Sequence, residues 1–563
     1  MAASVFAKFV ATPTAVFRKI SYPQLTPVRS AFWLKIPPFG TIILLLGYLG
    51  FILALEYIND SVPGAQHYAA LGIRAGWLAI TQIPLLILLA GKNNLIGLAT
   101  GVSYERLNVW HRWVARGVLL MATLHVGYQD YGWNLYGLRQ LEWSTDICTS
   151  TGLAAYVLLC WLNLSTLAPF RNFGYEFFVF QHLITFFGLI IAIMFHLSNT
   201  VLYTRVYIWI PIGLYLFDRL VRTLRSMVNN IHPGQATLEV LAGGVTRIRV
   251  QTRVKGWSPG AHVLLAIPRY GIGQSHPATI ASTPTSHNGD LLFILKAQKG
   301  FTRNLLESAN SSTASLLPGT KEQMAVQQKT HITFIDGPYG ASQADLACFD
   351  TVLLIAGSTG VTFTLPILLD LARRANKQSR KLPVRRVEFA WIIKNASHIS
   401  WISEELQAAF TVFQQTAVDI KVRIFVTRDE RLTDLSLTGH QGHNTEIMAT
   451  QGNGLAGNPV EITDAEASQT GESTPPSTRF YSPTQPATNE KLSPLEYATI
   501  ELGRPAFRPM VSDLVARAEG ETGIAVCGPL GLSTTVRMTV ASLTGCKTTD
   551  VHGIYLHVEG FSW

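Results

Sequence analysis

Six long apolar stretches in the first 230 residues constrain the fold more than any other feature of this chain. Each has close to the ~20 residues that a helix needs to cross a bilayer. Charged residues make up only 14% of the 563-residue chain, against about 25% in an ordinary soluble protein. The sequence therefore predicts a bundle of membrane-spanning helices. The spans are expected near residues 40–58, 69–90, 109–128, 150–168, 175–197 and 203–223.

The Lys and Arg residues of this half predict its orientation. It holds 16 Lys and Arg against 8 Asp and Glu, whereas the rest of the chain is nearly balanced, at 29 against 28. With the N-terminus inside, 13 of the 16 cations flank the inner ends of the spans, and only Arg74, Arg139 and Arg205 flank the outer ends. Because inner loops are enriched in Lys and Arg, we expect the large C-terminal half in the cytosol. This distribution argues against nucleic acid as a partner.

Residues 1–39 are predicted to form a cytosolic N-terminal tail, followed by a transmembrane domain over residues 40–228. The tail holds five Lys and Arg, no acidic residue and no continuous apolar core, so a cleaved signal peptide is not expected. A mitochondrial transit peptide is the alternative that its basic composition leaves open.

Four histidines form two matched pairs in the spans. His111 and His125 are 14 residues apart in the third span, and His182 and His196 have the same spacing in the fifth. Fourteen residues return a helix to nearly the same face about 21 Å along its axis. Hydrogen bonding between helices explains a single buried histidine, but two equal spacings indicate function, because ionisable groups inside a membrane are costly. We therefore expect two b-type haems, ligated by His111 with His182 and by His125 with His196. Three arginines lie at the levels of the haem propionates, where snorkelling explains them equally well: Arg74, Arg112 and Arg116.

After residue 228 the pattern changes to short strands separated by turns, which predicts a small antiparallel barrel over residues 229–345. Between two of these strands, His276–Ser282 combines a proline kink with hydroxyl and amide groups, which suits a flavin. The helix predicted after Gly300 could hold a pyrophosphate at its first amides, with a plain turn and cap as the alternative. Asp336–Gly340 is predicted to be a tight turn. The candidate flavin-binding residues are His276, Pro277, Ala278, Thr279, Ile280, Ala281, Ser282, Gly300 and Thr302.

Residues 346–563 alternate strands, glycine loops and helices, which predicts an α/β nucleotide-binding domain. A buried strand runs into the loop 357–362, and a later strand runs into 527–529. Neither loop is the GxGxxG fingerprint, but glycines before a helix let a phosphate approach the backbone. The candidate nucleotide-binding residues are Gly357, Ser358, Thr359, Gly360, Thr362, Cys527, Gly528 and Pro529.

Two further features of this domain are interpreted from composition. Lys394 and Arg428 end two strands and are candidates for contact with a 2′-phosphate, with solvated strand-end charge as the alternative. Residues 432–497 are rich in Ser, Thr, Gly and Pro and are interpreted as a disordered insertion.

Together these motifs resemble the fungal ferric reductases of the flavocytochrome b superfamily, to which NADPH oxidases also belong. The resemblance rests on the paired histidines, HPATIAS at 276–282, GSTGVTFTLP at 357–366, CGP at 527–529 and the terminal Phe561-Ser562-Trp563. It implies a multi-domain membrane protein, in which a six-helix transmembrane haem bundle is followed by a ferredoxin-NADP reductase-like unit. That unit comprises an antiparallel β-barrel FAD domain and an α/β NADPH domain.

The resemblance also implies cofactors and roles. The cofactors would be FAD, two haem b and NADPH, with Cys527 near the nicotinamide. Phe561 would be the aromatic side chain that covers the flavin, and Trp563 is the second choice. The implied activity is NADPH-dependent electron transfer to external ferric, or cupric, chelates at the plasma membrane in support of iron uptake.

Acceptors of this kind include siderophore-bound iron, and an iron permease or a multicopper oxidase would act downstream. A superoxide-generating NADPH oxidase is the alternative within the superfamily. The equal 14-residue spacing favours a metalloreductase, since oxidases of the superfamily usually have the second pair one residue closer. A haem-bearing transporter or sensor would not need the flavin and nucleotide motifs.

Overall fold

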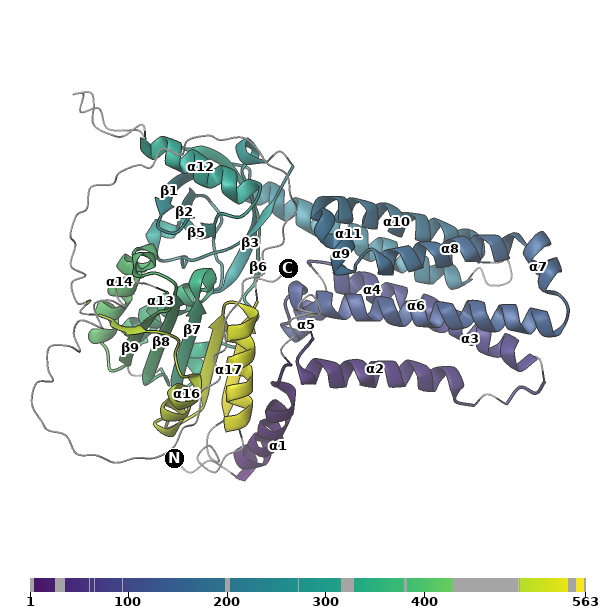
Figure 1. Cartoon of the computed structure of the whole chain (residues 1–563), viewed down its shortest axis with the longest axis horizontal. Coiled ribbons are helices and arrows are strands. Elements are labelled where there is room, and N and C mark those ends of the chain that lie inside the picture. The colour runs from purple at the N-terminus through teal and green to yellow at the C-terminus, as the bar shows by residue number, and fades with distance from the viewer. Residues whose placement is uncertain are drawn as a thin grey trace, which may run out of the picture.

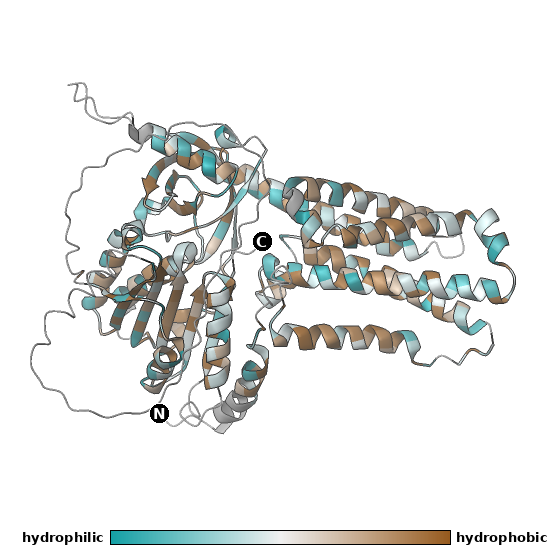
Figure 2. Cartoon of the chain, in the orientation of Figure 1, coloured by the Kyte–Doolittle hydropathy of each residue, from teal (hydrophilic) through white to brown (hydrophobic). Residues whose placement is uncertain are grey.

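The computed structural model of the chain has two parts (Figure 1). One is an elongated bundle of roughly aligned helices, and the other is a unit of two lobes, each built on a β-sheet. Apolar residues run along the whole bundle, whereas in the lobes they gather on the strands (Figure 2). The structure describes residues 5–25, 36–59, 61–64, 66–93, 95–197, 203–271, 273–314, 329–378, 382–428, 495, 497–544 and 553–560.

The bundle contains a helix at each predicted span. Four helical segments of the described residues have both the length and the hydropathy of a membrane span, namely α2, the α3–α4 unit, α8 and α10. The helices α6 and α11 match the predicted third and sixth spans but carry more charge, so the number of spans stays a prediction. The helices are α2 (Phe39–Tyr57), α3 (Gln66–Thr81), α4 (Ile83–Ala90), α5 (Leu95–Thr100), α6 (Tyr104–Leu135), α7 (Arg139–Thr145), α8 (Ile147–Leu164), α9 (Ala168–Phe173), α10 (Tyr175–His196) and α11 (Val206–Asn229).

The first lobe is an antiparallel sheet in the order β4-β3-β6-β1-β2-β5. Its edges meet where the N–H of Ala281 donates to the carbonyl of Leu292 over 2.7 Å, which closes the sheet into the predicted barrel. The prediction of a turn at Asp336–Gly340 is wrong, because these residues end β6 and pair with β3. The elements are β1 (Gly234–Leu241), β2 (Val245–Gln251), β3 (Ala261–Ala266), β4 (His276–Thr279), β5 (Leu291–Lys296), α12 (Phe301–Ala314) and β6 (His331–Gly340).

The second lobe is a parallel sheet in the order β10-β9-β8-β7-β11-β12, with α13 and α14 on one face and α16 and α17 on the other. Every residue of β7 is buried, as expected of a strand covered on both sides. Sequence analysis finds four of these strands and misses β10 and β12. The elements are β7 (Thr351–Gly357), α13 (Val361–Gln378), β8 (Arg386–Ile393), α14 (Ser403–Gln414), β9 (Asp419–Val426), β10 (Thr499–Leu502), α16 (Phe507–Ala516), β11 (Thr522–Cys527), α17 (Leu530–Leu543) and β12 (Ile554–Glu559).

Parts of the predicted N-terminal tail and of the predicted insertion are folded against the rest of the protein. Within the N-terminal tail, α1 (Val5–Ser21) is a helix that contacts α17 and the start of α2. The predicted insertion at 432–497 lies outside the described residues except for its last part, where Leu495 and Tyr497 pack into the core of the second lobe. Leu495 and Tyr497 thus belong to the packed lobe.

Candidate functional site

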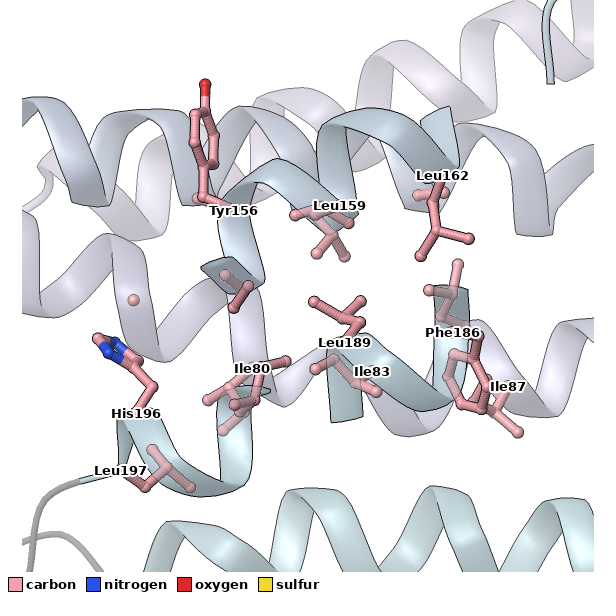
Figure 3. Close-up of a pocket in the computed structure, with 18 of the residues that line it drawn as sticks. Ile80, Ile83, Ile87, Tyr156, Leu159, Leu162, Phe186, Leu189, His196 and Leu197 are labelled. Carbon is pink, nitrogen blue, oxygen red and sulfur yellow. The ribbon is translucent and has the colours of Figure 1, made fainter. Parts of the chain in front are cut away.

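A cavity of about 680 Å³ runs along the inside of the bundle, and all four paired histidines line it. His111 and His182 belong to its lobe end, near the start of α6, and His125 and His196 belong to its far end. A largely apolar cavity with a few convergent polar groups is typical of a cofactor pocket. The apolar side chains in the close-up of Figure 3 include Ile80, Ile83, Leu159, Leu162, Phe186 and Leu189.

The far-end pair has the spacing that one haem iron requires. The ring centroids of His125 and His196 are 5.9 Å apart, and the ring planes are inclined by 76°. Metal–nitrogen bonds of about 2 Å on either side of an iron separate two imidazole centroids by roughly 6 Å. This spacing of the two rings would suit two ligands of one haem iron. Among the described residues no group of three or more His, Cys, Asp or Glu is suited to a metal ion, and axial ligation needs only two.

Backbone carbonyls fix three of the four histidine rings. Because a carbonyl oxygen only accepts, each Nδ1 must carry the proton, which leaves Nε2 free to bind a metal. The Nδ1 atom of His182 is buried and has no hydrogen-bond partner in the described part of the chain. The three bonds join His111 Nδ1 to Leu86 O (2.8 Å), His125 Nδ1 to Gly72 O (2.7 Å) and His196 Nδ1 to Cys148 O (2.8 Å).

Two glycines make room for the far-end rings. A Cβ atom on Gly76 would lie 2.9 Å from Nδ1 of His125, and one on Gly152 would lie 2.6 Å from the ring of His196. In each case the glycine follows by four residues the carbonyl that accepts the Nδ1 proton. One turn of a neighbouring helix thus supplies both the acceptor and the space. Sequence analysis missed both glycines, since nothing local marks them.

The cations predicted for haem propionates do not line the cavity. Arg74 donates to two carbonyls at the end of α2, Arg116 stacks on an indole ring, and Arg112 is likewise absent from the lining. The arginine that lines the cavity is Arg219 of α11, which is paired with Asp218.

Part of the flavin motif presents groups that a ligand can reach. His276, Pro277 and Thr279 lie on β4 and are half-buried. The ring of His276 stacks on Phe301, the first residue of α12, with centroids 5.6 Å apart. Burial lowers the pKa of His276, so the imidazole is neutral at pH 7. Gly300, directly before α12, has a φ of +64° and forms the turn that precedes the helix.

The other residues of the motif have their polar groups engaged in the fold. The side chains of Ala278, Ile280 and Ala281 are buried in the barrel. Ser282 is fully buried, and its hydroxyl donates to the carbonyl of Asp290 over 2.8 Å. The hydroxyl of Thr302, in the first turn of α12, accepts the N–H of Gln298 in the preceding loop over 2.9 Å. These residues shape the frame around a flavin, and their side chains have little left to offer it.

The two glycine loops of the second lobe meet at one place. A Cβ atom on Gly360 would collide with the carbonyl of Cys527, and one on Gly528 would lie 3.1 Å from the Cα of Gly357. Both loops follow the carboxyl ends of neighbouring strands, β7 and β11, where the strand order reverses. In open α/β sheets this is the point where nucleotides bind. Of the other candidates, Ser358 and Thr359 are half-exposed, Pro529 is exposed, and Thr362 donates to the carbonyl of Thr359.

Cys527 is fully buried at the end of β11, opposite Glu559 of β12 in the sheet register. Burial, reinforced by the charge of Glu559, raises the pKa of the thiol well above its ordinary value. The thiol is therefore protonated and is not a nucleophile at neutral pH. Phe561 and Trp563, predicted to cover the flavin, lie outside the described residues.

Three domain families match the chain in this order. Residues 75–193 match the ferric reductase like transmembrane component, 231–343 an FAD-binding domain, and 349–541 the ferric reductase NAD binding domain. The chain thus carries a ferric reductase like transmembrane component, an FAD-binding domain and a ferric reductase NAD binding domain in succession. The recognition from sequence is thereby confirmed, and so is the division into a transmembrane domain, an FAD domain and a nucleotide domain.

Curated ferric reductases align over much of the chain. It is 29% identical over 419 residues to a probable cell surface ferric reductase of Aspergillus oryzae, covering 69% of this chain and 52% of the relative. It is 27% identical over 395 residues to ferric/cupric reductase transmembrane component 7 of Saccharomyces cerevisiae, covering 67% and 58%. Component 4 of the same yeast is 24% identical over 519 residues, covering 86% and 63%. The aligned part thus spans between half and two thirds of these relatives.

The first lobe docks on the lobe end of the bundle through α11. Arg222 forms an ion pair with Asp336 of β6 over 2.6 Å, and Arg225 lies over the ring of Tyr339 at 4.3 Å. The hydroxyl of Tyr339 donates to Asp336 over 2.6 Å. The segment that sequence analysis assigned to a turn is therefore a docking strand.

The start of α6 makes a second set of contacts, with both lobes. Tyr104 forms a 3.0 Å hydrogen bond with His262 of β3. Arg106 lies 3.0 Å from Nε2 of His557 and 3.5 Å from Glu559 on β12. Burial lowers the pKa of His262 to about 4 and also lowers that of His557. Burial alone would raise the pKa of Glu559, but His557 and Arg106 hold it below its ordinary value. The interface thus joins neutral imidazoles to a charged carboxylate.

Proposed function

We propose that this protein transfers electrons from cytosolic NADPH across a membrane to an external ferric or cupric chelate. The observation that carries the proposal is a single cavity with a histidine pair at each end, docked at one end on a flavin-type barrel and a nucleotide-type sheet. When bound, NADPH, FAD and two b-type haems would supply hydride transfer and stepwise single-electron transfer between them.

The residues of the chain have distinct tasks in this proposal. His111, His182, His125 and His196 hold the two irons, and the apolar bundle keeps water from them. His276 and Thr279 orient the flavin beside the docking interface. The glycine loops at 357–360 and 527–529 let the nucleotide approach the backbone at the sheet's switch point.

The preference for NADPH is assigned to two cations at strand ends. The N–H of Arg428 donates to the carbonyl of Lys394 over 2.9 Å, so the two residues are neighbours at the carboxyl edge of the second sheet. A cation at this edge is the usual partner of a 2′-phosphate. Changing both residues to alanine is expected to raise KM for NADPH about tenfold and to leave KM for NADH unchanged.

The plasma membrane is the proposed location, with the lobes in the cytosol because 13 of 16 Lys and Arg flank that side. A relative named as a cell surface reductase and relatives named for ferric and cupric reduction support this proposal. Iron uptake, with a permease or a multicopper oxidase downstream, is the physiological role that we infer.

A superoxide-generating oxidase is the second candidate, favoured by the kinship of NADPH oxidases but opposed by the equal 14-residue spacing of the histidines. Intact cells expressing the protein should reduce a membrane-impermeant ferric chelate much faster than oxygen. The variant His196→Leu is the control and should abolish this reduction. Rapid oxygen consumption with an untouched chelate would establish the oxidase instead.

A further inference from the structure

The N-terminal helix α1 has one face bound to the second lobe. The guanidinium of Arg18 donates to the carbonyl of Ile554 over 3.4 Å, and the hydroxyl of Tyr22, just after α1, accepts the N–H of Leu556 over 3.2 Å. Both partners belong to β12, the strand that also carries His557 and Glu559 of the docking interface. The lobe-facing side of α1 is thus polar and engaged.

The opposite face of α1 is apolar, and no part of the chain that the structure describes covers it. Val16, Phe17 and Ile20 are 53%, 62% and 49% exposed. At about 100° per residue, Val16 and Ile20 lie roughly 160° around the helix from Arg18. The sequence continues this apolar spacing upstream at Phe9 and Pro13. An amphipathic helix with aromatic and aliphatic residues on one face is the pattern of a helix that lies in a membrane interface.

The fold places the C-terminal end of α1 at the level where the first membrane span begins. The N–H of Phe39, the first residue of the membrane span α2, donates to the carbonyl of Pro23 over 2.9 Å, and Gly40 packs on Ser21. In Figure 1, α1 lies beside α17, next to the start of α2, and does not continue the direction of α2. The C-terminal end of α1 therefore lies beside the start of a membrane span, where lipid would surround the bundle.

The charge of the segment selects the kind of lipid surface. Residues 1–39 contain five Lys and Arg and no acidic residue, and Lys19 is exposed beside the apolar face. A Lys or Arg near an anionic bilayer surface strengthens binding about fivefold. We propose that α1 is an interfacial helix that binds anionic phospholipid of the cytosolic leaflet and so ties the nucleotide lobe to the membrane. The side of the membrane rests on the proposed function.

Amide hydrogen exchange in the full-length protein tests this proposal. The protein is reconstituted in nanodiscs of phosphatidylcholine alone or of phosphatidylcholine with phosphatidylserine, and exchange of residues 13–21 is measured against α13 as the internal reference. We expect exchange to be about tenfold slower with phosphatidylserine. Replacing Phe17 and Ile20 together by glutamate should remove this difference while haem and FAD content stay unchanged.

A matched control separates lipid binding from a general effect of surface charge. Leu502 of the edge strand β10 is 48% exposed, and Leu502→Glu should leave the difference between the two nanodiscs intact. Equal exchange in both lipids would overturn the proposal. Slow exchange that occurs only in protein dimers, as detected by light scattering, would also overturn it. A mature N-terminus that begins after α1, as cleavage of a transit peptide would produce, would do the same. None of these readouts depends on ferric reduction.

Discussion

At the far end of the cavity both histidine rings are held by a carbonyl and lie against a glycine. At the lobe end His111 has a carbonyl partner, but Nδ1 of His182 has none among the described residues. The lobe end is supported differently, by the docked strands β3, β6 and β12. The far-end pair is thus fixed within the bundle. The lobe-end pair lies beside an interface whose strength depends on charge, and the two ends should respond differently to substitution and to pH.

Removing an axial ligand should have the largest effect and should separate the two ends. His125→Leu is expected to lose one of two haems and to reduce external chelate at least about 100-fold more slowly, while the lobe-end haem is still reduced by NADPH. His111→Leu should instead block reduction of the remaining haem. Haem content and stopped-flow absorbance measure both. A variant that keeps two haems per chain would refute the pairing.

The glycine contacts predict a smaller effect confined to the far end. Gly76→Ala and Gly152→Ala should each lower occupancy of the far-end haem about tenfold, because the new methyl group pushes the histidine ring out of place. Gly127→Ala on α6 is the control, since no atom lies within 4 Å of its Cβ position and alanine favours a helix by roughly 0.5–1 kcal/mol. Redox titration resolves the two haems. Equal loss from both haems would indicate general misfolding.

Loss of a docking ion pair should affect the lobe end alone. Asp336→Asn leaves Arg222 without its charged partner, and we expect NADPH-driven haem reduction to slow about tenfold, a cost of ~1.4 kcal/mol. The dithionite-reduced spectra of both haems should not change. Glu239→Gln removes an ion pair with Arg247 away from the interface and should change little. If Asp336→Asn changed the dithionite-reduced spectrum of either haem, the ion pair between Asp336 and Arg222 would support the bundle itself.

Mild acid should weaken docking gradually, since titration of His262 changes the docking free energy by at most ~1.4 kcal/mol per pH unit. Undocked His262 binds a proton near pH 6.5, but docked His262 does so only near 4, so docking is at full strength above pH 6.5 and weakens as pH falls. The depressed pKa of Glu559 acts in the same direction. By pH 4, protonation of undocked His262 should have weakened the free energy of docking by roughly 3 kcal/mol.

The measurement is the pH profile of NADPH-driven haem reduction between pH 7 and 5. Electron transfer from the prereduced far-end haem to external chelate should stay level over the same range. His262→Gln should flatten the profile of the first reaction. An unchanged profile in this variant would assign the pH dependence to another group.

The sequence by itself determined the features that repeat along a single helix or strand. The apolar spans, the two histidine spacings, the barrel strands and the glycine loops before helices are all visible because periodicity and chain order record them locally. The candidate pairs at 111 with 182 and at 125 with 196 follow from the same arithmetic, and the cavity holds all four side chains. Assignment of the individual flavin and nucleotide contacts stays a prediction.

Only the tertiary structure decided which residues of different helices and strands contact one another. Gly76 and Gly152 matter because α3 and α8 pack against histidines that are far away in the chain, and Asp336 became a docking residue because β6 pairs with β3 in front of α11. β12 and α1 carry weak local patterns, and each is stabilised by partners hundreds of residues away. Such contacts between elements leave no repeating pattern in the sequence, since they depend on how whole helices and strands pack.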